Sequence, residues 1–165
     1  FQIEGISIDD SALNYFSKEE IISNKQNYFK DKTYLVSEIE FKSFFQTYDA
    51  IQIYYKKNDR QYLVKGVVGF IDHINNINDC PKIQNEIDNV ISSLLVNFQR
   101  REQQTNHAAD KTGKSKVNSI DYFNSEGTIE LDCVNWSDDM GYIDNFNISI
   151  KSIELNEWFN NFAYK

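Results

Sequence analysis

The stretch that decides the fold is residues 79–98, DCPKIQNEIDNVISSLLVNF. Pro81 suits a first helical turn, where its missing N–H group would have no partner. Arg100 and Arg101 follow the stretch and place positive charge at the negative end of the helix dipole. The sequence therefore predicts one long amphipathic helix over about 80–99. Its apolar residues recur every three or four positions and predict one buried stripe: Ile83, Ile87, Val90, Ile91, Leu94, Leu95 and Phe98.

Segments on both sides of this helix alternate apolar and polar residues, which is the period of a half-buried strand. The predicted class is α+β: a mainly antiparallel sheet of about six strands, with the long helix packed across one face. His73 is expected to end a strand. The six strands are expected near 33–41, 51–56, 62–70, 117–123, 128–136 and 145–153.

Short helices are predicted at both ends of the chain. Asp10 and Ser11 are good N-caps for a first helix, and the segment 17–20, SKEE, matches a capping box that opens a second helix near 18–24. A closing helix is expected over 155–162. The whole chain, 1–165, is expected to form a single domain. Residues 99–116 are polar throughout and are expected to form a mobile loop.

Composition and charge exclude several classes of partner. Hydrophobic residues make up 41% of the 165 residues, which is ample for a packed core. The net charge of −8 argues against nucleic acid and against an anionic membrane surface. No apolar run approaches the roughly 20 residues of a transmembrane segment. A chain that begins at Phe1 favours the loss of an upstream secretion signal, with a trimmed expression boundary as the alternative.

Cys80 and Cys133 are the two cysteines of the chain. Cys80 falls on the predicted buried stripe of the helix, and Cys133 shares a strand face with Ile129 and Leu131. If helix and strand are neighbours, both thiols point into one core, so we expect a disulfide. Two unpaired cysteines that fill the core are the alternative. A disulfide favours a periplasmic or secreted location.

No motif in the chain identifies a catalytic, metal or cofactor site. The segment 113–115, GKS, resembles the end of a phosphate-binding loop, but Ala108 stands where that motif requires glycine. The acidic segment 135–141 offers oxygen ligands like a calcium loop, but Phe146 stands where the bidentate glutamate belongs. With no Gly-x-Ser-x-Gly elbow present, serine hydrolysis has no support. We therefore expect no cofactor and favour a protein that is not an enzyme.

Five residues are the candidate ligand-binding set: His107, Asp110, Lys114, Tyr122 and Trp136. The first three lie in the polar segment 99–116, where His107 and Asp110 are spaced to form a surface pair. A solvated histidine without a ligand is the alternative. Tyr122 and Trp136, together with Tyr54, are expected on the outward faces of their strands. Long loops without secondary structure are often functional.

Several segments spread over most of the chain carry a family resemblance: 3–8 (IEGISI), 10–11, 15–16, 79–80, 107–116, 133–137, 148–150 and Trp158. In these segments the chain resembles small exported bacterial proteins of uncharacterised function. The resemblance implies export and a shared fold that includes both cysteines. The N-terminal segment alone is also similar to the small lipoproteins of outer-membrane barrel assembly. Those have Gly-x-Pro after the first helix, where this chain has residues 17–19, SKE.

The function expected from these observations is that of an exported, non-catalytic binding or accessory protein of the bacterial cell envelope. Its partner would be an envelope protein or a small ligand. The alternative is a small-ligand binder or hydrolase with a pocket between the sheet and the 99–116 loop.

Overall fold

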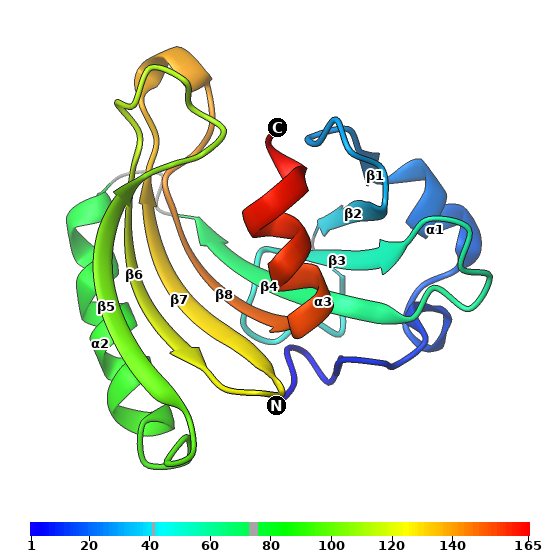
Figure 1. Cartoon of the computed structure of the whole chain (residues 1–165), viewed down its shortest axis with the longest axis horizontal. Coiled ribbons are helices and arrows are strands. Elements are labelled where there is room, and N and C mark those ends of the chain that lie inside the picture. Colours follow the sequence, from blue (N-terminus) through cyan, green and yellow to red (C-terminus); the bar gives the residue numbers. More distant parts are fainter. Residues whose placement is uncertain (41, 73–75) are drawn as a thin grey trace. The chain divides into compact units, whose positions relative to one another are not determined.

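The computed structural model describes residues 1–40, 42–72 and 76–165, so His73 and the expected strand end at position 41 lie outside the described residues. The fold is α+β, as predicted, with eight strands in the antiparallel order β1-β2-β3-β4-β8-β7-β6-β5 (Figure 1). The strands are β1 (Lys25–Gln26), β2 (Tyr34–Glu40), β3 (Ala50–Lys56), β4 (Val64–Asp72), β5 (Gln99–Asn106), β6 (Lys116–Phe123), β7 (Gly127–Asn135) and β8 (Asn145–Ser152). The helices are η1 (Ala12–Asn14), α1 (Lys18–Ser23), η2 (Ile77–Asp79), α2 (Cys80–Ile91), η3 (Asp138–Met140), α3 (Ile153–Trp158) and η4 (Phe159–Ala163).

The chain divides into two compact units. The first contains Phe1–Gly69 and Ser149–Lys165, and the second contains Phe70–Ile148. The expectation of a single domain stays a prediction, and each unit is described by itself.

In the first unit, Ser11 and Ser17 cap the N-terminal helices as predicted, whereas Asp10 accepts a hydrogen bond from the Ser7 amide instead. Ser17 accepts a hydrogen bond from the Glu20 amide, and the Glu20 carboxylate accepts one from the Ser17 amide, which completes the capping box of α1. α3 and η4 lie over β3 and β4 (Figure 1). Gly66 permits this packing, because a Cβ atom there would lie 2.3 Å from Cδ2 of Leu155.

Aromatic rings fill the core beneath the C-terminal helices of the first unit. Phe29 meets Trp158 edge to face with ring centroids 5.0 Å apart, and the Trp158 indole N–H donates to Asp31 Oδ1 over 2.6 Å. The prediction that Tyr54 faces outward is wrong. Its side chain is buried, because residues on both faces of β3 are covered, and its hydroxyl donates to Gln52.

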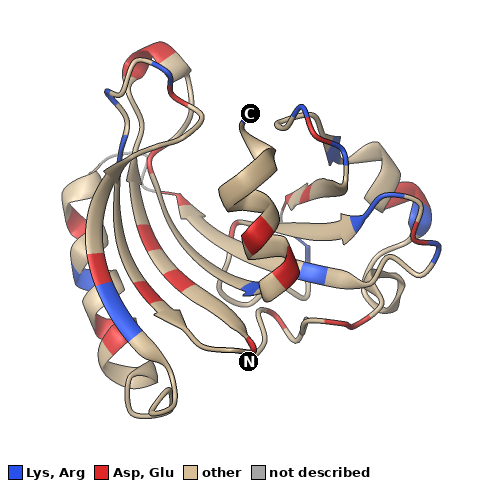
Figure 2. Cartoon of the chain, viewed as in Figure 1, with Lys and Arg blue, Asp and Glu red and all other residues tan. Residues whose placement is uncertain are grey.

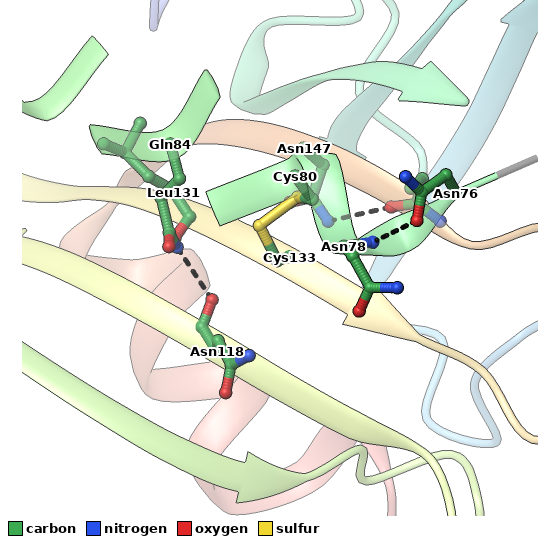
Figure 3. The surroundings of a disulfide bond; sticks show 9 residues. Asn76, Asn78, Cys80, Gln84, Asn118, Leu131, Cys133 and Asn147 are labelled. Carbon is green, nitrogen blue, oxygen red and sulfur yellow. Dashed lines mark hydrogen bonds between the residues drawn. A yellow bond between two sulfur atoms is a disulfide. The ribbon is translucent and has the colours of Figure 1, made fainter. Parts of the chain in front are cut away.

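In the second unit, α2 packs on the face of β6 and β7 that carries Ile120, Leu131 and Cys133 (Figure 3). Cys80 and Cys133 form the predicted disulfide, with a Cα–Cα distance of 5.9 Å. The bridge joins the first residue of α2 to the C-terminal part of β7. The strand alternation and the helical period thus placed both sulfur atoms in one core, as the sequence predicted.

The predicted long helix is shorter than expected, and its buried side is different. α2 ends at Ile91, and turns over 92–98 return the chain to the sheet. The serine pair at 92 and 93 is unfavourable for helix continuation, because serine hydroxyls compete for backbone hydrogen bonds. Val90 and Leu94 are 66% and 65% exposed, so the prediction that they belong to the buried stripe is wrong.

The residues of α2 that face the sheet include two polar side chains, Gln84 and Asp88, and both are buried. Gln84 Nε2 donates to the backbone carbonyls of Asn118 and Leu131, at 2.8 and 2.7 Å (Figure 3). A buried polar group is tolerated when its hydrogen bonds are made. Hydrophobic periodicity cannot reveal such partners, and this is why the predicted stripe is displaced.

The prediction of a loop without secondary structure over 99–116 is wrong for its first half. Residues 99–106 form β5, which pairs with β6 in unbroken antiparallel register from Gln99 opposite Phe123 to Asn106 opposite Lys116. β5 and the two-residue β1 raise the strand number from about six to eight. The sequence of β5 is polar at every position, so it carries no alternation to detect. Only residues 107–115 connect β5 and β6 as a loop, and its mobility stays a prediction.

Candidate functional site

Four of the five candidate residues come together at one end of the second unit. His107, Asp110 and Lys114 lie in the loop between β5 and β6, and Trp136 follows the last residue of β7. Figure 1 shows this loop beside the turn that contains η3, and contacts between the two segments hold them together. These two segments, 107–115 and 136–144, are called the tip below.

Asp110 organises the tip. Its Oδ1 accepts hydrogen bonds from the amide and hydroxyl of Thr112, at 2.8 and 2.7 Å. Its Oδ2 accepts from the amide and hydroxyl of Ser115, at 2.8 and 2.7 Å, and from the hydroxyl of Ser137 at 3.2 Å. These donors, those of Thr112 first, hold the pKa of the Asp110 carboxyl well below its ordinary value. A buried carboxylate with five donors fixes the loop and joins it to the segment after β7.

Three rings lie one against the next on this support, each tilted to its neighbour, with interplanar angles of 48° and 57°; they are called the stack below. The ring centroids of His107 and Trp136 are 4.1 Å apart, and those of Trp136 and Tyr142 are 4.8 Å apart. Burial lowers the pKa of His107 to about 4, against a smaller opposing effect of Asp110. The imidazole is therefore neutral at pH 7. Its Nδ1 accepts from the amide of Ala109 at 3.2 Å, so its proton resides on Nε2.

Polar side chains surround a shallow, open depression beside the stack. The depression is lined by Lys114, Trp136, Ser137, Asp138 and Asp139. Lys114 Nζ lies 2.6 Å from Asp139 Oδ2, and the hydrogen bond to Asp139 raises the pKa of Lys114. Both side chains are 63% exposed, and exposed ion pairs of this kind are worth only about 0–1 kcal/mol. Either partner can therefore turn to a ligand at little cost.

Tyr122 does not join the other four candidates. The prediction that it faces outward is wrong, because it is 2% exposed and lies under α2. Its hydroxyl donates to Asp88 Oδ1 over 2.5 Å, and Arg100 donates to both oxygens of Asp88 at 3.2 and 2.9 Å. Although burial opposes ionisation, these hydrogen bonds lower the pKa of Asp88. The cluster ties β5 and β6 to the helix.

A second polar cluster, on the opposite face of β5–β7, was missed by the sequence analysis. Arg101 donates to Asp121 Oδ2 through Nε at 3.1 Å and Nη2 at 2.8 Å, and Gln103 adds a third hydrogen bond at 2.9 Å. Glu130 lies opposite Asp121 in the register, and Asp132 lies opposite Ser119, so these acidic residues share one face. Figure 2 shows the acidic positions along these strands. The sequence signal for this cluster was the set of polar residues that alternate with apolar ones in the strand predicted over 128–136.

The described part of the chain contains no group of three His, Cys, Asp or Glu side chains arranged to hold a metal ion. None of its described helices combines the length and the apolar character needed to cross a bilayer.

Comparison with known proteins gives no relative from which a function could be transferred. No protein-family model matches the chain, and no curated protein or solved structure is significantly similar to it.

Proposed function

We propose that this protein is an exported, non-catalytic binding or accessory protein of the bacterial cell envelope, and that it binds through the tip. The observation that carries the proposal is the stack of His107, Trp136 and Tyr142 on a loop that Asp110 holds in place. Aromatic side chains supply large contact areas and are enriched where proteins bind their partners.

Preorganisation supports binding at the tip. A loop that must be ordered on binding loses affinity, because each immobilised side chain costs about 0.5–1.5 kcal/mol. Here the hydrogen bonds to Asp110 order residues 112, 115 and 137 before a ligand arrives. The free energy of contact with the rings is then available for affinity.

The disulfide supports an oxidising location. Disulfides persist in the periplasm and outside the cell, whereas cytosolic thiols are kept reduced. The Cys80–Cys133 bridge lies in the core of the second unit, where both residues are almost fully buried. This placement is that of a structural bridge and favours export.

The contacts of the tip favour binding over catalysis. Nucleophilic catalysis needs a hydroxyl or thiol within hydrogen-bond reach of a base. Among the described residues, the imidazole of His107 contacts the Ala109 amide and the Trp136 ring, and the Ser115 hydroxyl donates to Asp110. The hydrolase alternative placed a pocket between the sheet and residues 99–116. Because 99–106 belong to the sheet itself, only residues 107–115 remain as the loop of that alternative, and the small-ligand binder or hydrolase stays a prediction.

A thermal-shift screen tests the proposal. The wild type, Tyr142→Ala and Phe162→Ala are each screened against amino acids, nucleotides, lipids, metal salts, sugars and cell-envelope extracts. Phe162 is the matched control, because it is an aromatic residue of similar exposure, 57% against 52% for Tyr142, in the other unit. We expect a ligand class that stabilises the wild type and Phe162→Ala but not Tyr142→Ala. If no class stabilises the wild type, or if Tyr142→Ala responds equally, the tip is not a binding site.

A further inference from the structure

We infer that the ligand of the tip is a neutral carbohydrate, bound with one sugar ring against the aromatic stack and its hydroxyl groups in the adjoining depression. This inference rests on the proposed function and adds the chemical class of the ligand. It follows from the side chains that line the depression and from the ligand classes that they disfavour.

The aromatic side of the site suits the apolar face of a sugar. A pyranose presents C–H groups on one face, and these carry partial positive charge, whereas the face of an aromatic ring is negative. Tyr142 is 52% exposed at the end of the stack, and Trp136 forms part of the wall of the depression. A sugar ring therefore finds two adjoining ring surfaces, and one of them, Trp136, precedes Ser137, which Asp110 anchors.

The polar side of the site suits hydroxyl groups. The carboxylates of Asp138 and Asp139 accept hydrogen bonds from hydroxyls, and the ammonium of Lys114 donates to them. Hydrogen bonds with one charged partner are roughly twice as strong as neutral ones. A hydroxyl both donates and accepts, so it can bridge Lys114 and Asp139, which already lie 2.6 Å apart.

Other ligand classes fit this set of side chains less well. A phosphate or nucleotide would meet one lysine and two carboxylates in a chain of net charge −8. An organic cation would be attracted to Asp138 but would have to displace Lys114 from Asp139, which Lys114 contacts at 2.6 Å. An apolar ligand would desolvate Lys114 and both carboxylates without replacing their hydrogen bonds. A neutral ligand with an apolar face and many hydroxyls is not repelled by the charged side chains, and its hydroxyls replace the hydrogen bonds that those side chains lose to water.

Titration with defined oligosaccharides tests the inference. The probes are hexasaccharides of glucose, galactose, mannose and N-acetylglucosamine, and the readout is tryptophan fluorescence with calorimetry. The chain contains two tryptophans, and Trp158 is 4% exposed, so a change in quenching by iodide reports on Trp136. We expect at least one probe to bind with a Kd of about 1 mM or tighter. Tyr142→Ala should weaken that binding about tenfold or more, and Phe162→Ala should not.

A polar variant separates sugar binding from general adhesion to aromatic rings. Asp139→Asn keeps the size of the side chain and removes its charge, and it should weaken the sugar about tenfold while leaving the melting temperature unchanged, since Asp139 is 63% exposed. Glu126→Gln, an exposed carboxylate in the β6–β7 turn, is the matched control.

The outcomes distinguish this inference from the proposed function. If no probe binds at about 10 mM, but the thermal-shift screen finds another ligand class that depends on Tyr142, the carbohydrate inference is overturned and the proposed function stands. If no ligand of any class depends on Tyr142, both fail. Binding that is equal in the wild type and in Tyr142→Ala would place the sugar elsewhere and also overturn the inference.

Discussion

Replacing both Cys80 and Cys133 with alanine should destabilise the second unit, because the bridge closes a long loop of the unfolded chain. The two cysteines are 53 residues apart in sequence. For a loop of that length the chain-entropy relation gives about 4 kcal/mol of stabilisation at 25 °C. A whole domain is stable by about 5–15 kcal/mol, so the bridge supplies a large share. Alanine is preferred to serine, because a serine hydroxyl at either site would be buried.

Comparison of oxidised and reduced wild type isolates the loop-closure contribution. Both keep the sulfur atoms, so the change in the free energy of unfolding measured in urea reports the cross-link. The additional difference between the reduced wild type and the double alanine variant then reports the packing of the sulfurs. We expect the melting temperature to fall by about 8–16 °C on reduction, from about 2–4 °C per kcal/mol for a chain of this size.

Two results would refute this reasoning. If oxidised and reduced protein unfold at the same urea concentration, loop closure contributes nothing to stability. If thiol titration of the unfolded, unreduced protein finds two free thiols per chain, the bridge is absent in solution, and the support that it gives to an exported location is lost.

Three further predictions follow from the buried contacts of the second unit. Leu95→Ala should lower the free energy of unfolding, measured in urea, by about 2–5 kcal/mol, because Leu95 is 2% exposed. Leu94→Ala is the control and should change it by less than about 0.5 kcal/mol, because Leu94 is 65% exposed. Equal losses would mean that Leu94 is covered. Between about pH 6.5 and pH 4 the unfolded chain binds a proton at His107 that the folded chain excludes. As the pH is lowered through this range, the free energy of unfolding of the wild type should therefore decrease more than that of His107→Asn, which keeps an acceptor for the Ala109 amide. A difference between the two proteins that does not depend on pH would contradict the burial of the ring. Asp110→Asn turns an acceptor into a donor that faces other donors, so limited tryptic digestion should cut within 107–115 faster than in the wild type; an unchanged cutting rate would show that Asp110 does not order the loop.

The outcome at α2 shows where sequence reasoning succeeded and where it failed. The start of the helix, its amphipathic period and the inward position of Cys80 follow from local chemistry, and the structure confirms them. Its sheet-facing residues Gln84 and Asp88 do not follow from hydrophobicity, because their burial depends on partners that lie on β5, β6 and β7. The hydrophobic periodicity therefore predicted the position of the helix correctly but predicted the wrong buried side.

The same distinction applies to β5. Its residues have no apolar alternation, and in isolation a polar segment of this kind gains nothing from burial. It becomes a strand because β6 offers a complete backbone ladder and because the two arginines bind carboxylates on opposite sides of the sheet, Arg100 to Asp88 and Arg101 to Asp121. These partners come from distant segments, so local sequence contains no signal for the strand.

The sequence by itself determined the α+β class, six of the eight strands of the described residues, the capped N-terminal helix and the inward positions of Cys80 and Cys133. These features depend on near neighbours in the chain or on a period of two or 3.6 residues, both of which can be read directly. Only the tertiary structure decided that His107, Trp136 and Tyr142 form one stack, and that Asp110 supports it. Those residues come from two segments separated by a whole hairpin, and the pairing of β6 with β7 is what brings the segments together.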